Sequence, residues 1–325
     1  MDFLINFLGL IASLAVLIWG ADKFVDNSSI LAKKLGINEL TIGLTVVALG
    51  TSAPEIFVGI SSVLNKSENI AMGAVVGSNI SNIALIFGVS CIGISFKPKE
   101  TPIIQLLPFL LSAIVLGFTL YDLKVSILDS ILLLIVFLYF LYVIIKNKSQ
   151  TNIGIPEESE NQNNPITLIL LTIGLIALIF GSRYAVIYAE NIAILLNISE
   201  LIIGLTIIAI GTSLPELAAT ISAVMKKKTD MVVGNVIGSN VLNITLVVPI
   251  IGLFSNVELE QVLFARDYFI MSIATIAFML IVIFYSSNII KLNAIRFIGV
   301  LCLLAYTGYC LLYTSDAADE SSSVD

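Results

Sequence analysis

The sequence predicts an all-α membrane protein that crosses the bilayer about ten times, arranged as two inverted repeats of five helices. Three observations lead to this fold class. Apolar residues make up 58% of the chain and charged residues only 12%, with a mean hydropathy of +1.04, far from the balance of a soluble domain. Ten apolar runs are long enough to cross a hydrocarbon core about 30 Å thick. The stretch from about residue 20 to residue 82, within the first five runs, also recurs 161 residues later, within the last five.

The ten runs divide into two groups of five, separated by a polar segment. The first group lies near residues 3–25, 40–64, 70–95, 103–121 and 126–145. The second group lies near residues 166–188, 200–224, 231–254, 268–285 and 292–313. We therefore expect a first repeat at 1–145, a linker at 146–164 and a second repeat at 165–313. Residues 314–325 are polar and are predicted to be a disordered tail, or a segment foreign to the natural chain.

An internal duplication relates the two groups. Glu216 follows Glu55 by 161 residues, and the same offset relates Gly20 to Gly181, Gly43 to Gly204, and Asn82 to Asn243. A chance likeness between apolar helices would not reproduce Gly-Thr-Ser-x-Pro-Glu and Gly-Ser-Asn-x-x-Asn in register, so we infer a true repeat. A repeated unit with an odd number of spans enters the membrane the opposite way in its second copy. The two repeats are therefore predicted to be inverted, as in many secondary transporters.

The basic residues indicate which loops face the cytoplasm. With the N-terminus outside, twelve of the 16 Lys and Arg residues fall in cytoplasmic loops and helix ends. These are Lys23, Lys33, Lys34, Lys97, Lys99, Lys146, Lys148, Lys226, Lys227, Lys228, Lys291 and Arg296, whereas Lys66, Lys124, Arg183 and Arg266 fall outside. Because Lys and Arg accumulate on the cytoplasmic side, we predict a multi-pass protein of the cell membrane with both termini outside and the linker 146–164 inside.

Each repeat carries a proline and a glutamate side by side within an apolar run, in GTSAPE (50–55) and GTSLPE (211–216). Pro54 and Pro215 have no amide hydrogen and displace the carbonyl four residues earlier, so they are predicted to break their helices. Glu55 and Glu216 place carboxylates at bilayer depth, where charges are costly and mark functional sites. One such motif alone would indicate only a kinked helix. Two copies indicate the two halves of one ion site.

Polar side chains near the glutamates complete an all-oxygen set of candidate ligands. They are Thr51, Ser52, Ser78 and Asn82 in the first repeat, and Thr212, Ser213, Ser239 and Asn243 in the second. In each repeat the later Ser and Asn are four residues apart, so they share one helix face. Carbonyls freed by the prolines add neutral oxygens. Because this set contains no His and no thiol, it suits a hard cation, with Ca²⁺ favoured over Mg²⁺.

At this point the sequence resembles a known family. The stretches GLTVVALGTSAPE (43–55) and GLTIIAIGTSLPE (204–216), with GSNISN (77–82) and GSNVLN (238–243), resemble the two alpha-repeats of the sodium/calcium exchangers, within the calcium/cation antiporter superfamily. The resemblance covers essentially the whole chain, since ten helices with a central cytoplasmic linker are also the family's layout. The short linker lacks the large regulatory calcium-binding domains of animal exchangers. The chain therefore looks like a minimal prokaryotic member.

The resemblance implies roles for individual residues. Glu55 and Glu216 would bind Ca²⁺ together, helped by the backbone carbonyls of Thr51 and Thr212. Carbonyls of Ala48 and Ala209 would be sodium ligands, and Asn82 would lie at the centre. The full implied sodium-binding set is Ala48, Ser52, Ser78, Asn82, Ala209, Ser213, Ser239 and Asn243, with both glutamates.

Asn243 departs from the family pattern, because many sodium/calcium exchangers have an aspartate there. The core of this chain thus has two carboxylates rather than three acids. An amide is roughly isosteric with a protonated aspartic acid, so Asn243 is compatible with sodium exchange if that acid is normally neutral. A proton/Ca²⁺ antiporter, or another cation/Ca²⁺ antiporter of the same fold, stays open as the alternative.

We expect a secondary antiporter, not an enzyme, that exchanges Ca²⁺ for Na⁺ by alternating access and extrudes Ca²⁺ with the sodium gradient. The family resemblance suggests that the helices around 3–25 and 166–187 slide across the motif core. The expected partners are the two transported ions and the lipid bilayer, with no cofactor, nucleic acid or obligatory protein partner. A cation channel is disfavoured because one pair of non-identical halves makes a poor pore ring. An intramembrane hydrolase is disfavoured because no nucleophile with a base or a metal is evident at depth.

Overall fold

A computed structural model describes residues 2–93, 103–147, 164–196, 209–255 and 258–322. Within these ranges the chain is helical, and the one extended pairing is a bridge between Lys124 and Glu258. Short π-helical segments, marked η, interrupt several helices. The first half contains α1 (Asp2–Lys34), α2 (Glu39–Ile42), η1 (Gly43–Val47), α3 (Ala48–Thr51), α4 (Ala53–Asn65), α5 (Glu68–Ser81), η2 (Asn82–Phe87), α6 (Gly88–Gly93), α7 (Ile103–Tyr121) and α8 (Ile127–Lys146). The second contains α9 (Asn164–Leu195), α11 (Ala209–Thr212), α12 (Leu214–Met225), α13 (Thr229–Leu242), η5 (Asn243–Val247), α14 (Val248–Phe254), η6 (Leu263–Tyr268), α15 (Phe269–Ser286) and α16 (Leu292–Ser322).

The predicted membrane-spanning fold is confirmed. Eight described helices are long and apolar enough to cross a membrane, and the bent pair Glu39–Thr51 and Ala53–Asn65 adds a ninth span. The predicted run at 200–224 is described only from α11 onward. Most of the predicted linker lies outside the described residues, and so do Lys97, Lys99 and Lys148. α1 extends to Lys34, past the predicted end at residue 25, because polar side chains after that point, such as Asn27 and Ser28, are buried by tertiary packing.

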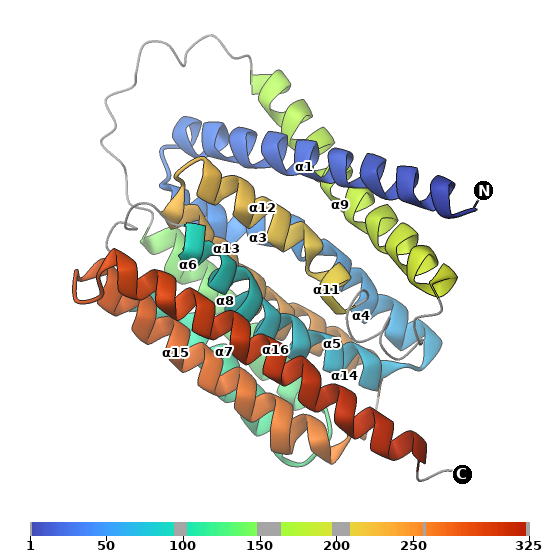
Figure 1. Cartoon of the computed structure of the whole chain (residues 1–325). Helices are drawn as coiled ribbons and strands as arrows, with labels where there is room; N and C mark the ends of the chain where they lie inside the picture. Colours follow the sequence, from blue (N-terminus) through green and yellow to red (C-terminus); the bar gives the residue numbers. More distant parts are fainter. Residues whose placement is uncertain (1, 94–102, 148–163, 197–208, 256–257, 323–325) are drawn as a thin grey trace.

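α1 and α9 cross each other on one side of the bundle, at the top of Figure 1. A Cβ atom on Gly20 would lie 2.5 Å from the backbone nitrogen of Leu178, and one on Gly181 would lie 2.6 Å from that of Leu17. The two helices therefore meet backbone to backbone, as small residues allow in membranes. Gly181 is the equivalent of Gly20, and Leu178 is the equivalent of Leu17, at the 161-residue offset. The contacts Gly20–Leu178 and Leu17–Gly181 are therefore the same contact with the two halves exchanged. Equivalent residues of the two halves thus make the same contact twice at this crossing.

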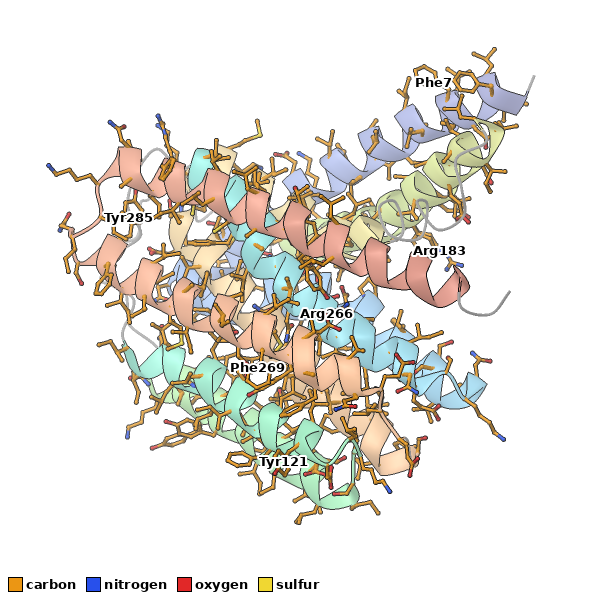
Figure 2. The ribbon with its side chains drawn as sticks, turned by 60° about the horizontal axis from the view of Figure 1, so that its bottom comes forward. Phe7, Tyr121, Arg183, Arg266, Phe269 and Tyr285 are labelled. Carbon is orange, nitrogen blue, oxygen red and sulfur yellow. The ribbon has the colours of Figure 1, made fainter. Side chains whose placement is uncertain are left out.

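The centre of the molecule consists of α5 and α13 with the π-helical segments that follow them. In the most apolar stretch of Glu68–Gly93, 78% of the residues are buried, and in that of Thr229–Phe254, 83% are buried, against 17% in Phe3–Lys34. Phe7 on α1 and Tyr121 on α7 lie at the periphery in Figure 2, and their side chains are exposed. An exposed apolar exterior around a polar-containing centre is the arrangement expected of a helical bundle in lipid.

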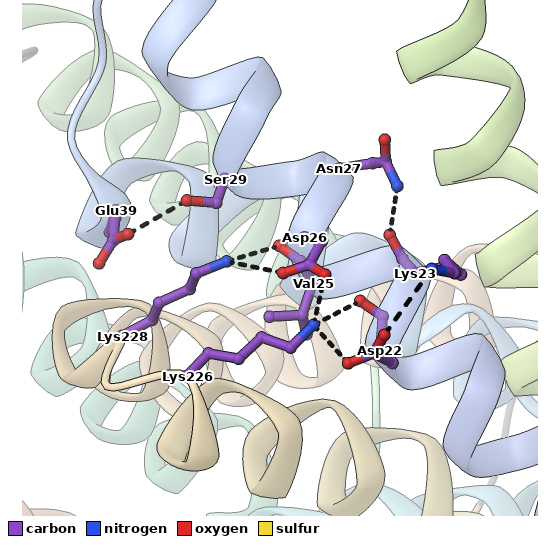
Figure 3. A network of polar contacts seen from close by, with 9 residues as sticks. All are labelled: Asp22, Lys23, Val25, Asp26, Asn27, Ser29, Glu39, Lys226 and Lys228. Atoms are coloured by element: carbon purple, nitrogen blue, oxygen red, sulfur yellow. Dashed lines mark hydrogen bonds and ion pairs between the residues drawn. The ribbon is translucent and has the colours of Figure 1, made fainter. Parts of the chain in front are cut away.

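A network of ion pairs fastens α1 to the turn between α12 and α13 (Figure 3). The Lys226 ammonium contacts the carboxylates of Asp22 and Asp26, and the Lys228 ammonium lies 3.3 Å from Asp26 Oδ1. Lys23, Lys33 and Lys227 join Asp26, Lys226 and Lys228 around a hollow of about 510 Å³. Several lysines that were predicted to be cytoplasmic thus gather at one end of the molecule, and which side of the membrane this end faces stays a prediction.

The polar segment at 314–325 differs from the prediction of a disordered tail, because α16 runs without a break to Ser322. Ala317, Ala318 and Glu320 have high helix propensity. They extend a helix that already exists, so no new helix nucleus has to form. The last three residues lie outside the described residues.

Candidate functional site

The two motif helices break at equivalent serines. Ser52, between α3 and α4, has φ −84° and ψ 4°, and Ser213, between α11 and α12, has φ −93° and ψ 8°. Pro54 and Pro215 follow as the second residues of α4 and α12, where a missing amide hydrogen costs no helix bond. The first pair of half-helices is bent by 44°. The predicted breaks are therefore present, with the backbone change located at Ser52 and Ser213.

The two glutamates lie in the first turns of the half-helices that start at these breaks. Glu55 is 5% exposed and Glu216 is 1% exposed. The N-terminal end of a helix carries a partial positive charge, which favours a carboxylate in its first turn. The Oε2 atoms of Glu55 and Glu216 are nevertheless buried without a hydrogen-bond partner among the described residues. Each half therefore contributes one carboxylate oxygen that is free to bind a cation.

The serine at the first break connects the two halves. Ser52 Oγ lies 3.2 Å from Glu216 Oε1 and donates a hydrogen bond to it. The Ser213 hydroxyl, at the second break, lies 2.8 Å from the Ser81 hydroxyl of α5. Sequence reasoning did not single out Ser81, because a lone serine in an apolar helix is an ordinary packing residue. The two breaks thus lie next to elements of the opposite half.

A second polar contact joins the halves at Thr51. Its hydroxyl lies 3.3 Å from Asn235 Oδ1, and Asn235 Nδ2 lies 3.1 Å from Thr220 Oγ1. Asn235 was not predicted as part of the site, although the sequence contained a signal for it. The two repeats differ at this position, where the first has Ala74, and an unmatched buried polar residue requires a partner.

A small cavity of about 20 Å³ adjoins Glu55. Its lining includes Glu55 and Ser78 from the first half and Thr212 from the second. Ala74 also lines it, at the position where the second repeat has Asn235. The volume exceeds the roughly 10–15 Å³ that one water-sized particle requires, so there is room beside Glu55, although the exposed wall of the cavity is almost entirely apolar.

The remaining predicted ligands are also buried near the breaks. Asn82, Ser239 and Asn243 are each 1% exposed or less, and an oxygen of each has no hydrogen-bond partner among the described residues. Asn82 and Asn243 also begin the π-helical segments η2 and η5. Such π-helical interruptions are common at functional sites.

Two predicted carbonyl ligands lie in the short helices that precede the breaks. The Ala48 carbonyl already accepts hydrogen bonds from Ser52 N, at 2.9 Å, and from Thr51 Oγ1, at 3.4 Å. Ala209 is the first residue of α11, and its side chain lies outside the described part of the structure. Thr212, at the end of α11, is half-buried and lines the small cavity.

These residues come from both halves, and the buried atoms that they leave without partners are oxygens. The oxygens without partners belong to two carboxylates, two carboxamides and one hydroxyl, namely Glu55, Glu216, Asn82, Asn243 and Ser239. Buried polar atoms without partners are costly unless something satisfies them. Hard cations such as Ca²⁺ and Na⁺ prefer this donor set. The arrangement can therefore bind a small cation between the two halves.

Comparison with known proteins gives the same family for nearly the whole chain. The sequence profile described as sodium/calcium exchanger protein matches residues 5–146 and 166–314. Inner membrane protein YrbG of Escherichia coli is 37% identical over 282 residues, covering 84% of this chain and 87% of that protein. Sodium/calcium exchanger MaX1 of Methanosarcina acetivorans is 30% identical, covering 95% of this chain and 98% of that protein.

Solved structures support the same assignment. The sodium/calcium exchanger from Methanococcus jannaschii superposes with a TM-score of 0.79 at 31% sequence identity, covering 94% of this chain and 97% of that chain. The fold, the paired glutamates between two sequence repeats, and these likenesses agree. The chain belongs to the sodium/calcium exchanger family of membrane antiporters.

Proposed function

We propose that this chain exchanges Ca²⁺ for Na⁺ across a membrane, with both ions bound between the two halves. The observation that carries the proposal is the pair of buried glutamates, one from each half, whose Oε2 atoms have no hydrogen-bond partner among the described residues. Two carboxylates balance the charge of one Ca²⁺. The names of the related proteins from Methanosarcina acetivorans and Methanococcus jannaschii support this choice of ions.

The ligands of each ion follow from the position of the neutral oxygens. Glu55 and Glu216 bind Ca²⁺ with the carbonyls of Thr51 and Thr212, because the helix breaks lie directly beside the glutamates. Sodium ions occupy overlapping sites that use the same carboxylates together with neutral oxygens. Those neutral ligands are Ala48, Ser52, Ser78, Asn82, Ala209, Ser213, Ser239 and Asn243. Because the sites share carboxylates, occupancy by one ion excludes the other, which makes transport an exchange.

Alternating access is proposed to occur by movement of α1 and α9 across the rest of the bundle. The two helices contact each other backbone to backbone through Gly20 and Gly181, so they can move as a pair. They lie on the opposite side of the bundle from α15 and α16 in Figure 1. Asp22 and Asp26, in the second half of α1, contact Lys226 in the turn that follows α12, so these ion pairs have to open or shift when α1 moves. We propose that movement of the pair opens the site to one side of the membrane at a time.

The sodium gradient is proposed to drive Ca²⁺ out of the cell, with the linker 146–164 in the cytoplasm and both termini outside. The basic residues support this orientation, because Lys23, Lys33 and Lys226–Lys228 lie around one end of the molecule and the positive-inside rule assigns that end to the cytoplasm. Lys124 and Glu258, which form an ion pair of 3.0 Å, then belong to the outer surface.

Calcium-45 uptake into proteoliposomes tests the proposal. Vesicles are loaded with sodium or with choline at one fixed pH on both sides, and wild type is compared with Glu55→Gln and Glu216→Gln. Glu258→Gln is the matched control, because its side chain is 81% exposed and pairs only with Lys124 among the described residues. Uptake should require internal sodium, disappear in both site variants and persist in the control.

A proton-coupled antiporter is the second candidate, and Asn243 is the observation that favours it. With an amide at this position, the site has two carboxylates and no third acid. If internal sodium makes no difference but an imposed pH gradient drives calcium-45 uptake, the proton-coupled exchange is correct and sodium coupling is wrong. If Glu55→Gln abolishes uptake under the sodium gradient and under the pH gradient, the glutamates are required for Ca²⁺ transport whichever ion is coupled to it.

A further inference from the structure

Two asparagines outside the proposed ligand set hold the amides of the two proposed asparagine ligands. Asn82 Nδ2 donates to Asn240 Oδ1 at 3.1 Å, and Asn243 Nδ2 donates to Asn79 Oδ1 at 3.3 Å. Each hydrogen bond crosses from one half to the other, because Asn79 and Asn82 belong to the first repeat and Asn240 and Asn243 to the second. Both bonds therefore join the continuous helix α5–η2 of the first half to the continuous helix α13–η5 of the second half.

The two contacts are copies of one another under the repeat. Adding 161 to Asn82 gives Asn243, and adding 161 to Asn79 gives Asn240. The bond from Asn82 to Asn240 thus becomes the bond from Asn243 to Asn79 when the halves are exchanged. The same contact therefore occurs in both copies of the repeat.

The direction of both hydrogen bonds determines which end of each amide remains free. A carboxamide has a donor end, Nδ2, and an acceptor end, Oδ1. In Asn82 and in Asn243 the donor end is occupied, while Oδ1 is buried without a hydrogen-bond partner among the described residues. Only the oxygen can bind a cation, because the amide hydrogens would repel it. The contact thus presents each proposed ligand with its oxygen available.

Both holding residues are buried, and Asn79 has further polar contacts, whereas the Nδ2 of Asn240 has no hydrogen-bond partner among the described residues. Asn79 Nδ2 lies 3.5 Å from the Asn240 carbonyl and 3.7 Å from Met271 Sδ, and Asn79 and Asn240 are 2% and 0% exposed. Asn79 and Asn240 each precede the ligand of their own half, Asn82 or Asn243, by three residues, which is about one helical turn, so the two side chains lie on the same side of that helix. A buried side chain with fixed neighbours loses little further freedom when an ion binds.

We propose that Asn79 and Asn240 are positioning residues of the ion site, each orienting the carboxamide of the opposite half's ligand so that its oxygen binds the transported cation. This rests on the proposed function, since it assigns Asn82 and Asn243 as ion ligands. The observed contact satisfies only the nitrogen end, and it does so in both halves.

Ion-dependent stabilisation of the purified protein separates positioning from structural support. A ligand that binds only the folded state raises the melting temperature with its concentration. The melting temperature is measured without Na⁺ or Ca²⁺ and then along a titration with each ion, for wild type, Asn79→Ala and Asn240→Ala. Asn79→Leu and Asn240→Leu are measured as well, because leucine removes the Oδ1 acceptor but still fills the space of the asparagine side chain. They serve in place of any alanine variant that does not fold.

Asn27→Ala is the matched control, because Asn27 is a buried asparagine of α1 whose Nδ2 bonds to the Lys23 carbonyl, away from the site. All variants should melt at a lower temperature than wild type in ion-free buffer. Only the variants of Asn79 and Asn240 should require more ion for half-maximal stabilisation, by about tenfold, since loss of the acceptor leaves a buried donor unsatisfied. The same shift should appear in the half-saturating Na⁺ concentration for calcium-45 exchange.

Two contrary results have different meanings. If the variants of Asn79 and Asn240 retain wild-type half-saturation for both ions while their ion-free melting temperature falls, the residues are structural and the inference is wrong. If wild type is stabilised by neither Na⁺ nor Ca²⁺ and exchanges neither, the proposed function itself fails, and the inference fails with it.

Discussion

Ser52 of the first half donates a hydrogen bond of 3.2 Å to Glu216 of the second half. The equivalent serine, Ser213, contacts Ser81 instead of Glu55. The two glutamates are therefore not equivalent, although the sequence motifs around them match closely. A hydroxyl that donates to a carboxylate stabilises its charged form, and this form is the one that binds Ca²⁺.

Replacing Ser52 should weaken Ca²⁺ binding through Glu216. We expect Ser52→Ala to lower Ca²⁺ affinity about fivefold, because a hydrogen bond of this kind contributes about 1 kcal/mol. Equilibrium binding of calcium-45 to the purified protein, in the absence of Na⁺, measures the change. Unchanged or tighter binding would show that the hydroxyl does not act on the carboxylate.

Removing Asn235 should destabilise the contact between Thr51 and the second half. Asn235→Ala places an alanine at position 235, as at the equivalent position 74 of the first repeat. It removes the hydrogen bond between the buried hydroxyl of Thr51 and Asn235. We expect a loss of about 1 kcal/mol in the free energy of unfolding, since the substitution removes buried hydrogen bonds to Thr51 and Thr220, while the Thr51 hydroxyl keeps its contact with the Ala48 carbonyl. Denaturant unfolding in detergent measures it, and a stability equal to wild type contradicts the prediction.

Side chains larger than hydrogen at the crossing of α1 and α9 should separate the two helices. A Cβ on Gly20 or Gly181 would meet backbone atoms of the facing helix at 2.5 or 2.6 Å, which no side chain rearrangement can relieve. Gly20→Ala and Gly181→Ala should therefore reduce exchange at least tenfold, measured as calcium-45 uptake. Gly308→Ala is the control, because no described atom lies within 4 Å of its Cβ position, and it should retain wild-type uptake.

The ion pairs in Figure 3 should contribute measurably to the attachment of α1. In a double-mutant cycle, Asp26→Asn and Lys226→Gln should show a coupling energy of about 1 kcal/mol, a value reduced for solvent screening because both side chains are partly exposed. Thermal unfolding at low and high salt measures this energy, and the coupling should shrink at high salt. Strictly additive effects of the two substitutions would count against a direct pair.

The same network of ion pairs should make the stability of the folded protein depend on pH. Burial lowers the pKa of Lys228, and Asp26 opposes that shift. A buried lysine with a lowered pKa destabilises the fold while it is charged, so stability is regained as the pH rises past that pKa. Asp26→Asn removes the opposing charge and should lower the Lys228 pKa further. The stability lost in Asp26→Asn should be largest near neutral pH and should shrink towards alkaline pH in thermal melts.

The parts of the site that could be predicted from sequence are the residues a bilayer rarely tolerates. Glu55, Glu216, Pro54 and Pro215 stand out because charges and helix breakers are costly at membrane depth. Their equivalence by a constant offset predicted that they belong to one site, and the structure places them at matching helix breaks. The long apolar spans were equally accessible, since they depend only on hydropathy and length, and eight of them, with a bent pair as a candidate ninth, occur among the described residues.

The supporting polar residues could not be predicted in the same way. Ser81, Asn79 and Asn240 are ordinary polar residues within helices, and their roles depend on partners more than 130 positions away in the chain. The π-helical segments that begin at Asn82 and Asn243 have no composition signal either. Backbone geometry of this kind is decided by tertiary packing rather than by the local propensities that a single sequence displays.

The exchanged contacts between the halves are those of a symmetric dimer. If the two repeats were separate chains, the pair Gly20–Leu178 with Leu17–Gly181 and the pair Asn82–Asn240 with Asn79–Asn243 would form an isologous interface, in which each chain offers the same patch to the other. One five-helix unit could therefore have assembled with a second copy before the two were fused. Two fragments of the chain, produced separately and divided within the linker, should therefore associate through these contacts.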